Sequence, residues 1–205
     1  EGKDPLIANL YSTRNRVERL MKTGKEALFN HVSEAKRRLT KPVARSWCWS
    51  GVSDSSGISR IPLLKYYRDD AGKYVTSSVI VARDPEDGVV NMSVHRLLHL
   101  GSNRFAERIV EGRHLHQIFM KHKDNGRDLK VAVLIGTPVH IILSASTQLP
   151  KEVSEVDYAG ALNGKPLEVT YFDGLDLTVP IESEYVFEGT IRISLNAREW
   201  MTDIL

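Results

Sequence analysis

Residues 73–96 read KYVTSSVIVARDPEDGVVNMSVHR and decide the fold that the sequence predicts. The part from Lys73 to Ala82 is rich in β-branched residues, which are typical of strands. The segment Asp84–Gly88 is a turn that ends on glycine, and Val89–Arg96 continues as a second strand. The stretch therefore predicts a β-hairpin.

The chain after Ile61 adds more strands than helices. Further strands are expected at residues 130–135, 167–172, 175–179 and 184–194. Helices are expected at residues 114–123 and 138–145, and a short helical or turn segment opens at Ser154 and Glu155. Thr137 is the expected N-cap of the second helix, with Pro138 in its first position. Several strands with few helices among them favour an antiparallel or mixed barrel over a doubly wound parallel sheet.

The segment before the hairpin has a different pattern. Residues 4–39 show helical spacing of apolar side chains, in one helix or in helices broken near Gly24, with the basic run 36–38 in the last turn. Residues 50–60 are small and polar, as in a loop or linker. The sequence thus predicts an α+β fold with an N-terminal helical region at 1–60, a strand-rich domain at 61–195 and a tail at 196–205.

Composition excludes several classes of protein. The 205 residues are 41% hydrophobic, which supports a packed core, and their net charge of +2 does not indicate a nucleic-acid or membrane surface. The sequence contains no apolar run long enough to span a bilayer. The single cysteine, Cys48, excludes an intramolecular disulfide and lies between two tryptophans, a context typical of a buried small hydrophobe. We therefore expect a cytoplasmic protein.

Three polar residues stand in otherwise apolar or Gly/Pro-punctuated surroundings: Asn91, His114 and Glu155. An amide oxygen, an imidazole and a carboxylate together form a ligand set for a hard divalent cation such as Mn²⁺ or Mg²⁺, unlike the thiolates of structural zinc sites. Spacing alone leaves open whether the three side chains meet in space. The sequence therefore offers a candidate metal site whose members lie far apart along the chain.

Other residues near these three are suited to an anion. Arg96, Arg113 and the run Ser-Ala-Ser-Thr at 144–147 could hold the phosphate of a cofactor, although small residues after a helix also indicate close packing. Asn91 and Arg96 are an odd number of residues apart, so a flat strand would point them to opposite faces. If both serve one site, a bulge or the end of the strand must lie between them.

Motifs along most of the chain resemble the UbiD-like decarboxylases of the polyprenyl-hydroxybenzoate and ferulate type. The matching segments are Asp4–Arg16, Ile61–Lys65, Arg83–Gly88, Asn91 with Arg96, Glu111–His114, Ile135–Pro138, Ser154–Leu162 and Glu184–Gly189. The resemblance implies a split β-barrel domain of the flavin-binding kind. It also implies prenylated FMN, or FMN, as the cofactor and a carboxylic acid that is unsaturated or aromatic as the substrate.

The resemblance also implies roles for individual residues. Asn91, His114 and Glu155 would hold Mn²⁺ or Mg²⁺ next to the flavin phosphate, and Arg96 would lie by the flavin and the substrate carboxylate as the catalytic arginine. Arg113 would lie near the cofactor, and the run 144–147 would line the phosphate and a K⁺ ion. The implied cofactor-binding set is Asn91, Ser93, Val94, Arg96, Arg113, His114, Ser144, Ala145, Ser146 and Thr147.

The chain departs from the family after Ser194. The family continues into a motif of the type Glu-Gly-Pro-Phe-Gly-Glu, whose carboxylates complete the acid–base network, whereas this sequence gives LNAREWMTDIL. Glu199 and Asp203 lie in that tail without the glycines, so the role is not transferred to them. We expect the cofactor-binding part of a decarboxylase that needs a second polypeptide or a C-terminal domain for turnover, and that forms a homo-oligomer or a complex with that second subunit. The alternatives are a non-catalytic paralogue that binds flavin or a partner, and a piece of a longer enzyme.

Overall fold

The computed structural model describes residues 7, 10–24, 27–47, 58 and 61–195. The expectations for Cys48, for most of the linker at 50–60 and for the tail at 196–205 fall outside these residues.

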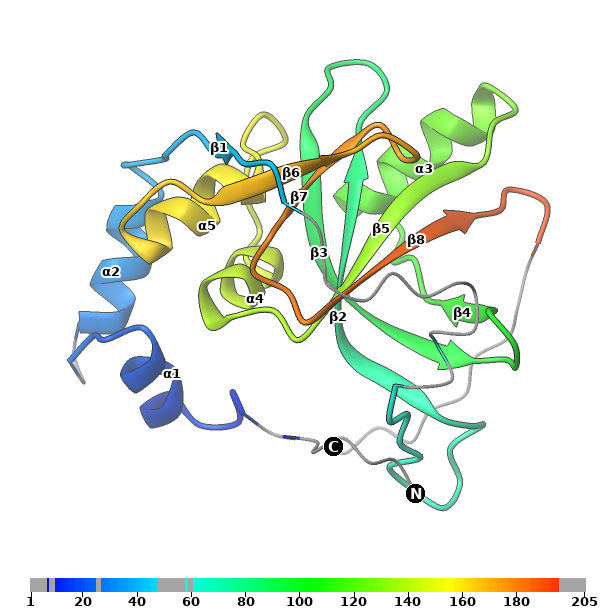
Figure 1. The fold of residues 1–205 in the computed structure, drawn as a ribbon, viewed down its shortest axis with the longest axis horizontal. Helices are drawn as coiled ribbons and strands as arrows, with labels where there is room; N and C mark the ends of the chain where they lie inside the picture. The colour runs from blue at the N-terminus through cyan, green and yellow to red at the C-terminus, as the bar shows by residue number, and fades with distance from the viewer. Residues whose placement is uncertain (1–6, 8–9, 25–26, 48–57, 59–60, 196–205) are drawn as a thin grey trace.

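The described residues form helices packed around two sheets (Figure 1). The helices are α1 (Arg14–Leu20), α2 (Ala27–Ala35), α3 (His114–Asp124), α4 (Val139–Ser146) and α5 (Glu155–Asn163). The antiparallel five-stranded sheet has the order β4 (Phe105–Glu107), β3 (Val90–His99), β2 (Tyr74–Arg83), β5 (Leu129–Ile135) and β8 (Tyr185–Ile191). The smaller sheet has the order β1 (Val43–Ala44), β6 (Glu168–Phe172) and β7 (Leu177–Pro180).

The predicted hairpin forms the middle of the large sheet. Strands β2 and β3 pair from Arg83–Val90 at the turn to Tyr74–Leu98 at the far end. Strand β2 alternates its side chains between two cores: Val79 and Val81 belong to one hydrophobic cluster, whereas Ile80 belongs to the other. The sheet is therefore covered on both faces, which explains why residues 79–82 form a continuous apolar run.

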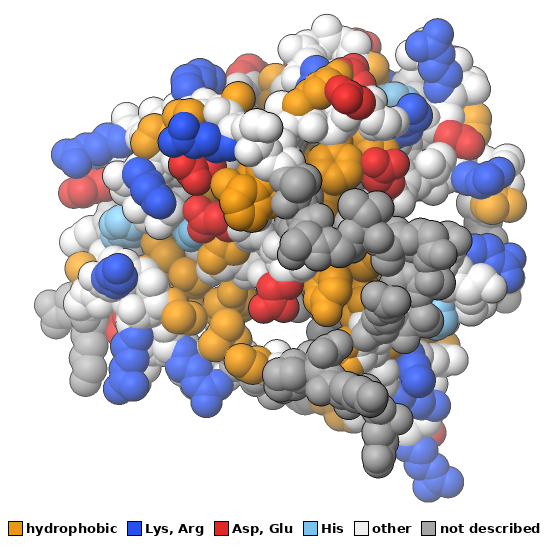
Figure 2. Space-filling model, viewed as in Figure 1, with side chains coloured by type: hydrophobic (Ala, Val, Ile, Leu, Met, Phe, Trp, Pro, Cys, Tyr) orange, Lys and Arg blue, Asp and Glu red, His pale blue; other side chains and the backbone are white. Residues whose placement is uncertain are grey.

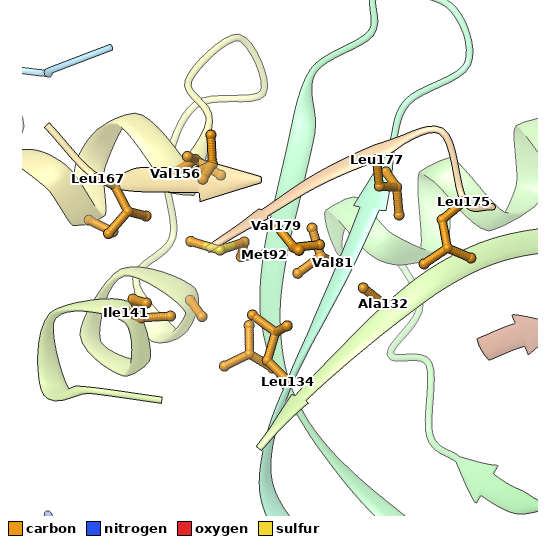
Figure 3. Packing of buried hydrophobic residues seen from close by; sticks show 14 residues of the cluster. Val81, Met92, Ala132, Leu134, Ile141, Val156, Leu167, Leu175, Leu177 and Val179 are labelled. Atoms are coloured by element: carbon orange, nitrogen blue, oxygen red, sulfur yellow. The ribbon is translucent and has the colours of Figure 1, made fainter. Parts of the chain in front are cut away.

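The two cores have different covers. On one face, Ile141 of α4, Val156 of α5 and Val179 of β7 pack against Met92 and Val81 of the hairpin (Figure 3). On the other face, α3 contributes Leu115 and Ile118 to the cluster that holds Ile80. This curled sheet between helices confirms the predicted α+β class with a barrel-like centre.

Several boundaries predicted from the sequence were wrong. Within the described part of residues 4–39, helix covers only α1 and α2, and the basic run 36–38 follows α2 instead of forming its last turn. Pro138, not Thr137, is the N-cap of α4, which begins at Val139 because Pro138 has extended backbone angles. The run 144–147 forms the last turn of α4 and its C-cap, so Ser144 to Ser146 are helical. The short strands β1 and β4 had no sequence signal.

The described residues give no indication of a membrane span, and the face in Figure 2 shows no single basic patch. No helix among the described residues is long and apolar enough to cross a bilayer. On the face in Figure 2, lysine and arginine side chains are spread around the periphery. This distribution agrees with the small net charge.

Gly160 provides a test of how closely α5 packs. A Cβ at this position would collide with the Thr40 hydroxyl and lie 2.9 Å from the Leu167 backbone nitrogen. Alanine normally stabilises a helix by about 1 kcal/mol relative to glycine. We predict the opposite for Gly160→Ala, a loss of about 1–3 kcal/mol in the free energy of unfolding measured in urea. Gly24→Ala is the control, since its Cβ meets no atom within 4 Å; equal stability of Gly160→Ala and the parent would contradict the packing.

Candidate functional site

The site is built on the outer edge of β3. Strand β4 pairs only with residues 97–99 of β3, so within the described part of the chain no strand pairs with the segment 90–96 on that side. Two of its backbone groups find side-chain partners there: the Met92 amide donates to Glu155 Oε2 at 3.0 Å, and the Val90 carbonyl accepts from Ser154 Oγ at 2.6 Å. The start of α5 is thereby fastened along the open edge of the strand.

Glu155 is held from several directions. Asn91 Nδ2 donates to Glu155 Oε2 at 3.1 Å, and Ser144 Oγ donates to the Glu155 backbone carbonyl at 2.6 Å. Ser154 caps α5 by accepting from the Val156 amide at 3.2 Å. Thus β3 binds the carboxylate, while α4 and the cap of α5 hold the Glu155 backbone in place.

His114 comes to the same place on the first turn of α3. Its Nδ1 lies 3.8 Å from Glu155 Oε1. The helix is anchored at its other end by Lys121, whose Nζ lies 2.7 and 2.8 Å from the two Asp84 oxygens at the hairpin turn. Burial raises the pKa of Asp84, but the hydrogen bonds from Lys121 and the Glu86 amide outweigh burial and lower the pKa overall. This ion pair thus fixes the position of α3, and with it His114, relative to β3.

The pKa of Glu155 is raised well above the ordinary value. Burial raises its pKa from the ordinary value of 4.5 to about 7, although the bonds from the Met92 amide and Asn91 lower it. The side chain is 4% exposed, whereas that of His114 is 27% exposed. A cation next to Glu155 would offset the cost of burying the carboxylate charge.

A pocket of about 650 Å³ opens beside the β3 edge, between β3, α3 and the end of α4. The sequence-predicted residues that line it are Asn91, Ser93, Val94, Arg96, Arg113, His114, Ala145, Ser146, Thr147 and Glu155. Ser144 does not line the pocket; it is fully buried and supports Glu155 from behind. The structure therefore brings nearly all of the candidate residues to one cavity, and their roles there stay predictions.

Arg96 reaches this pocket at an irregular point of the hairpin. The pairing of β2 with β3 shifts register between Val75 and Ser78, opposite residues 95–97 of β3. The odd spacing of Asn91 and Arg96 called for a bulge or a strand end between them, and this register shift is a bulge of that kind. Its extra residue lies on β2 and not on β3. Both residues line the pocket.

Three arginines, Arg96, Arg108 and Arg113, line the pocket. Arg113 Nη1 is 3.5 Å from Gln148 Oε1, at the limit of a hydrogen bond. His116 also lines the cavity. Guanidinium groups suit phosphates and carboxylates, so the pocket can bind anions next to the buried carboxylate.

The sequence interpretation missed His95 and Glu107, which lie behind Asn91 and Ser93. Ser93 Oγ lies 3.3 Å from Asn91 Oδ1 and 2.8 Å from His95 Nε2, and His95 Nδ1 lies 2.8 Å from Glu107 Oε1. Asn91, Ser93 and His95 alternate along β3, and this period of two was a signal that they share a face. Glu107 lies on the short strand β4 and had no comparable signal.

The donor set fits a hard divalent cation. Among the residues that the structure describes, no three His, Cys, Asp or Glu side chains gather as a metal site, so a set of three protein ligands at this place would have to include the Asn91 amide. Atoms bound about 2.0–2.2 Å from one cation lie roughly 3–4 Å apart, and the distance of 3.8 Å between His114 Nδ1 and Glu155 Oε1 is in that range. The Asn91 amide lies beside the same carboxylate, with its nitrogen 3.1 Å from Glu155 Oε2.

Comparisons with known proteins agree with the resemblance. Residues 41–204 match the UbiD family, described as the 3-octaprenyl-4-hydroxybenzoate carboxy-lyase Rift-related domain. The anhydromevalonate phosphate decarboxylase of Methanothermobacter thermautotrophicus is 33% identical over 97% of this chain. The alignment covers 47% of that relative, so the chain spans about half of its length.

Solved structures give the same picture. The UbiD-class enzyme HmfF from Pelotomaculum thermopropionicum, in complex with FMN, is 27% identical with a TM-score of 0.82, over 92% of this chain and 44% of that one. An evolved dimeric form of HmfF, in complex with prenylated FMN, is 28% identical with a TM-score of 0.77, over 87% of this chain and 43% of that one.

The raised pKa of Glu155 predicts a pH-dependent stability. The folded, metal-free chain binds this proton more tightly than the unfolded chain, so the contribution is fully present below about pH 4.5 and is lost as the pH rises through about 7. The full difference is about 3 kcal/mol. Glu155→Gln removes it, so the stability of the variant relative to the parent should rise from pH 4.5 to pH 8.

Urea unfolding in a chelator at several pH values measures this difference. Glu152→Gln, which changes an exposed carboxylate in the same segment, is the control and should track the parent. A Glu155→Gln difference that is constant across this pH range would contradict the effect of burial.

Proposed function

The chain belongs to the UbiD family, and from this premise we propose that it forms the metal- and prenylated-FMN-binding part of a non-oxidative decarboxylase. The observation that carries the proposal is the meeting of Asn91, His114 and Glu155 beside a pocket lined by three arginines. The substrate is a carboxylic acid that is unsaturated or aromatic.

Asn91, His114 and Glu155 would hold the divalent cation, Mn²⁺ or Mg²⁺. When bound, the cation supplies positive charge that fixes a flavin phosphate in the pocket. Arg113 and the end of α4 at 145–147 line the same cavity and are suited to the remaining phosphate oxygens. The hydroxyl groups of Ser146 and Thr147 also suit a K⁺ ion.

The β3 edge is suited to the flavin ring. The residues whose backbone groups face outward alternate along a strand, so Val94 follows Val90 and Met92 on the open side. A planar ring with donors and acceptors on its rim can hydrogen-bond to such an edge. When bound, prenylated FMN supplies the electron-accepting chemistry that allows carbon dioxide to leave.

Arg96 is proposed to orient the substrate carboxylate. A guanidinium binds a carboxylate through two parallel hydrogen bonds, a geometry that lysine does not reproduce. Arg96 remains protonated at any working pH, so it positions the substrate and does not transfer a proton.

The pocket also suits a phosphorylated substrate. A relative is named for anhydromevalonate phosphate, an acid that carries a phosphate. A flavin phosphate, a substrate phosphate and a substrate carboxylate make three anionic groups, and Arg96, Arg108 and Arg113 line the cavity. We therefore favour a small phosphorylated acid over an aromatic acid that carries no phosphate.

Proton return requires a group from elsewhere. Glu155 is the only carboxylate among the described residues that line the pocket, and it is assigned to the cation. The family motif that supplies the acid–base carboxylates has no counterpart in the tail after Ser194. A second polypeptide, or a C-terminal part of the same enzyme, is proposed to bring them, and the enzyme is proposed to work as an oligomer.

Cofactor binding is testable by thermal unfolding. Addition of FMN and Mn²⁺ together should raise the melting temperature of the chain by about 5–10 °C when both ligands are near 100 times their dissociation constants. FMN without the cation should give a much smaller shift, because the metal fixes the phosphate. Glu155→Gln should abolish the metal-dependent part, and Glu152→Gln should keep it; a shift that is independent of Mn²⁺ would contradict the joint site.

Catalysis is testable by reconstitution. The chain alone, with prenylated FMN, Mn²⁺ and K⁺, should release no carbon dioxide from phosphorylated or unphosphorylated unsaturated acids. Addition of a polypeptide that carries the missing Glu-Gly-Pro-Phe-Gly-Glu motif should restore release, and the Arg96→Lys chain should restore much less. Turnover by the chain alone would disprove the assignment of the proton donor to another segment.

A further inference from the structure

We propose that Glu107, His95 and Ser93 are positioning residues that turn the Asn91 amide so that its oxygen faces the cation. The inference rests on the metal site of the proposed function and assigns a role to residues outside the ligand set. The inference follows from which atoms can donate a proton and which can only accept one along the short contacts that join Glu107, His95, Ser93 and Asn91.

The contacts run in one line from β4 to Glu155. Glu107 Oε1 lies 2.8 Å from His95 Nδ1, and the two side chains are 10% and 11% exposed. His95 Nε2 lies 2.8 Å from Ser93 Oγ, which lies 3.3 Å from the Asn91 side-chain oxygen. The other end of that amide lies 3.1 Å from Glu155 Oε2.

Glu107 determines which nitrogen of His95 carries the proton. Its Oε1 is buried and makes no aligned hydrogen bond within the described residues, so His95 Nδ1 at 2.8 Å is the charge partner that the structure gives it. A proton on Nδ1 is favoured beside an anionic oxygen, whereas a lone pair there would be repelled. In the tautomer with its proton on Nδ1, His95 presents Nε2 to Ser93 as an acceptor.

The Ser93 hydroxyl has one proton, which it can donate either to His95 Nε2 or to the Asn91 side-chain oxygen. If it donates to His95 Nε2, its oxygen can only accept from Asn91, so the Asn91 NH₂ group must point to Ser93. The amide oxygen then faces Glu155. Two oxygens at about 3 Å repel each other in the absence of a cation and form adjacent ligands in its presence.

The opposite arrangement suits the metal-free chain. Ser93 donates to Asn91 Oδ1, and Asn91 Nδ2 donates to Glu155 Oε2, as the structure has it. The two arrangements use nearly the same heavy-atom positions and differ by a half-turn of the amide. Glu107 and His95 therefore shift the balance toward the arrangement that binds metal.

The test is Mn²⁺ affinity alone, measured by the electron paramagnetic resonance signal of free Mn²⁺ during titration of the folded chain. His95→Leu removes the acceptor for the Ser93 proton, and we expect a loss of about tenfold in affinity, as for other outer-shell partners of metal ligands. His95→Gln, which offers an amide oxygen to Ser93 and an NH₂ group to Glu107, should stay within about threefold of the parent.

The decisive variant is Ser93→Ala combined with His95→Leu. The Ser93 hydroxyl donates to the Asn91 oxygen and so turns that oxygen away from the cation. Because Ser93→Ala removes this donor, the double variant should bind Mn²⁺ more tightly than His95→Leu alone. A purely structural role for His95 predicts equal or weaker binding. If His95→Leu does not fold, Glu107→Leu, which removes the acceptor for the His95 Nδ1 proton, replaces it, with a loss in the same direction and a recovery on adding Ser93→Ala.

The outcomes separate the two levels of the account. A parent chain that takes up no Mn²⁺ would contradict the metal site of the proposed function and this inference with it. A parent that binds Mn²⁺ while His95→Leu binds it equally well, or while the double variant shows no recovery, would overturn the positioning role and leave the metal site standing.

Discussion

The contact between Glu155 and the open edge of β3 is the interaction on which the rest of the site depends. The edge has backbone groups that need partners, since β4 reaches only its far end. Glu155 and Ser154 supply those partners through the Met92 amide and the Val90 carbonyl. The bonds that cover the strand edge therefore also place a carboxylate beside Asn91, so that fold stability and site geometry have a common origin.

This arrangement has an electrostatic cost. Burial raises the pKa of Glu155 to about 7, so the ionised form is poorly accommodated in the metal-free chain. His114, which can ligate a cation, lies on one side of Glu155. Three arginines, which suit anions, line the pocket beside it. The proposed divalent cation with a phosphate beside it would satisfy both kinds of group.

The fold was predictable where local patterns are strong, and the site only in part. The turn at 84–88 and the β-branched runs beside it identified the hairpin, because turn chemistry and alternation are local properties. Asn91, His114 and Glu155 were recognisable by residue type and by family resemblance. Their meeting depends on Lys121 binding Asp84 and on Ser144 binding the Glu155 carbonyl, and such contacts over long sequence distances leave no periodic signal. Glu107 was missed for the same reason.

Crystals of the chain grown with Mn²⁺ and FMN would test the central claim most directly, by anomalous diffraction at the manganese edge. The account predicts one strong peak bounded by the side chains of Asn91, His114 and Glu155, with the flavin phosphate as its nearest non-protein neighbour. A peak at another acidic group, such as Asp84 and Asp87 at the hairpin turn, or bound FMN with no manganese beside its phosphate, would contradict it.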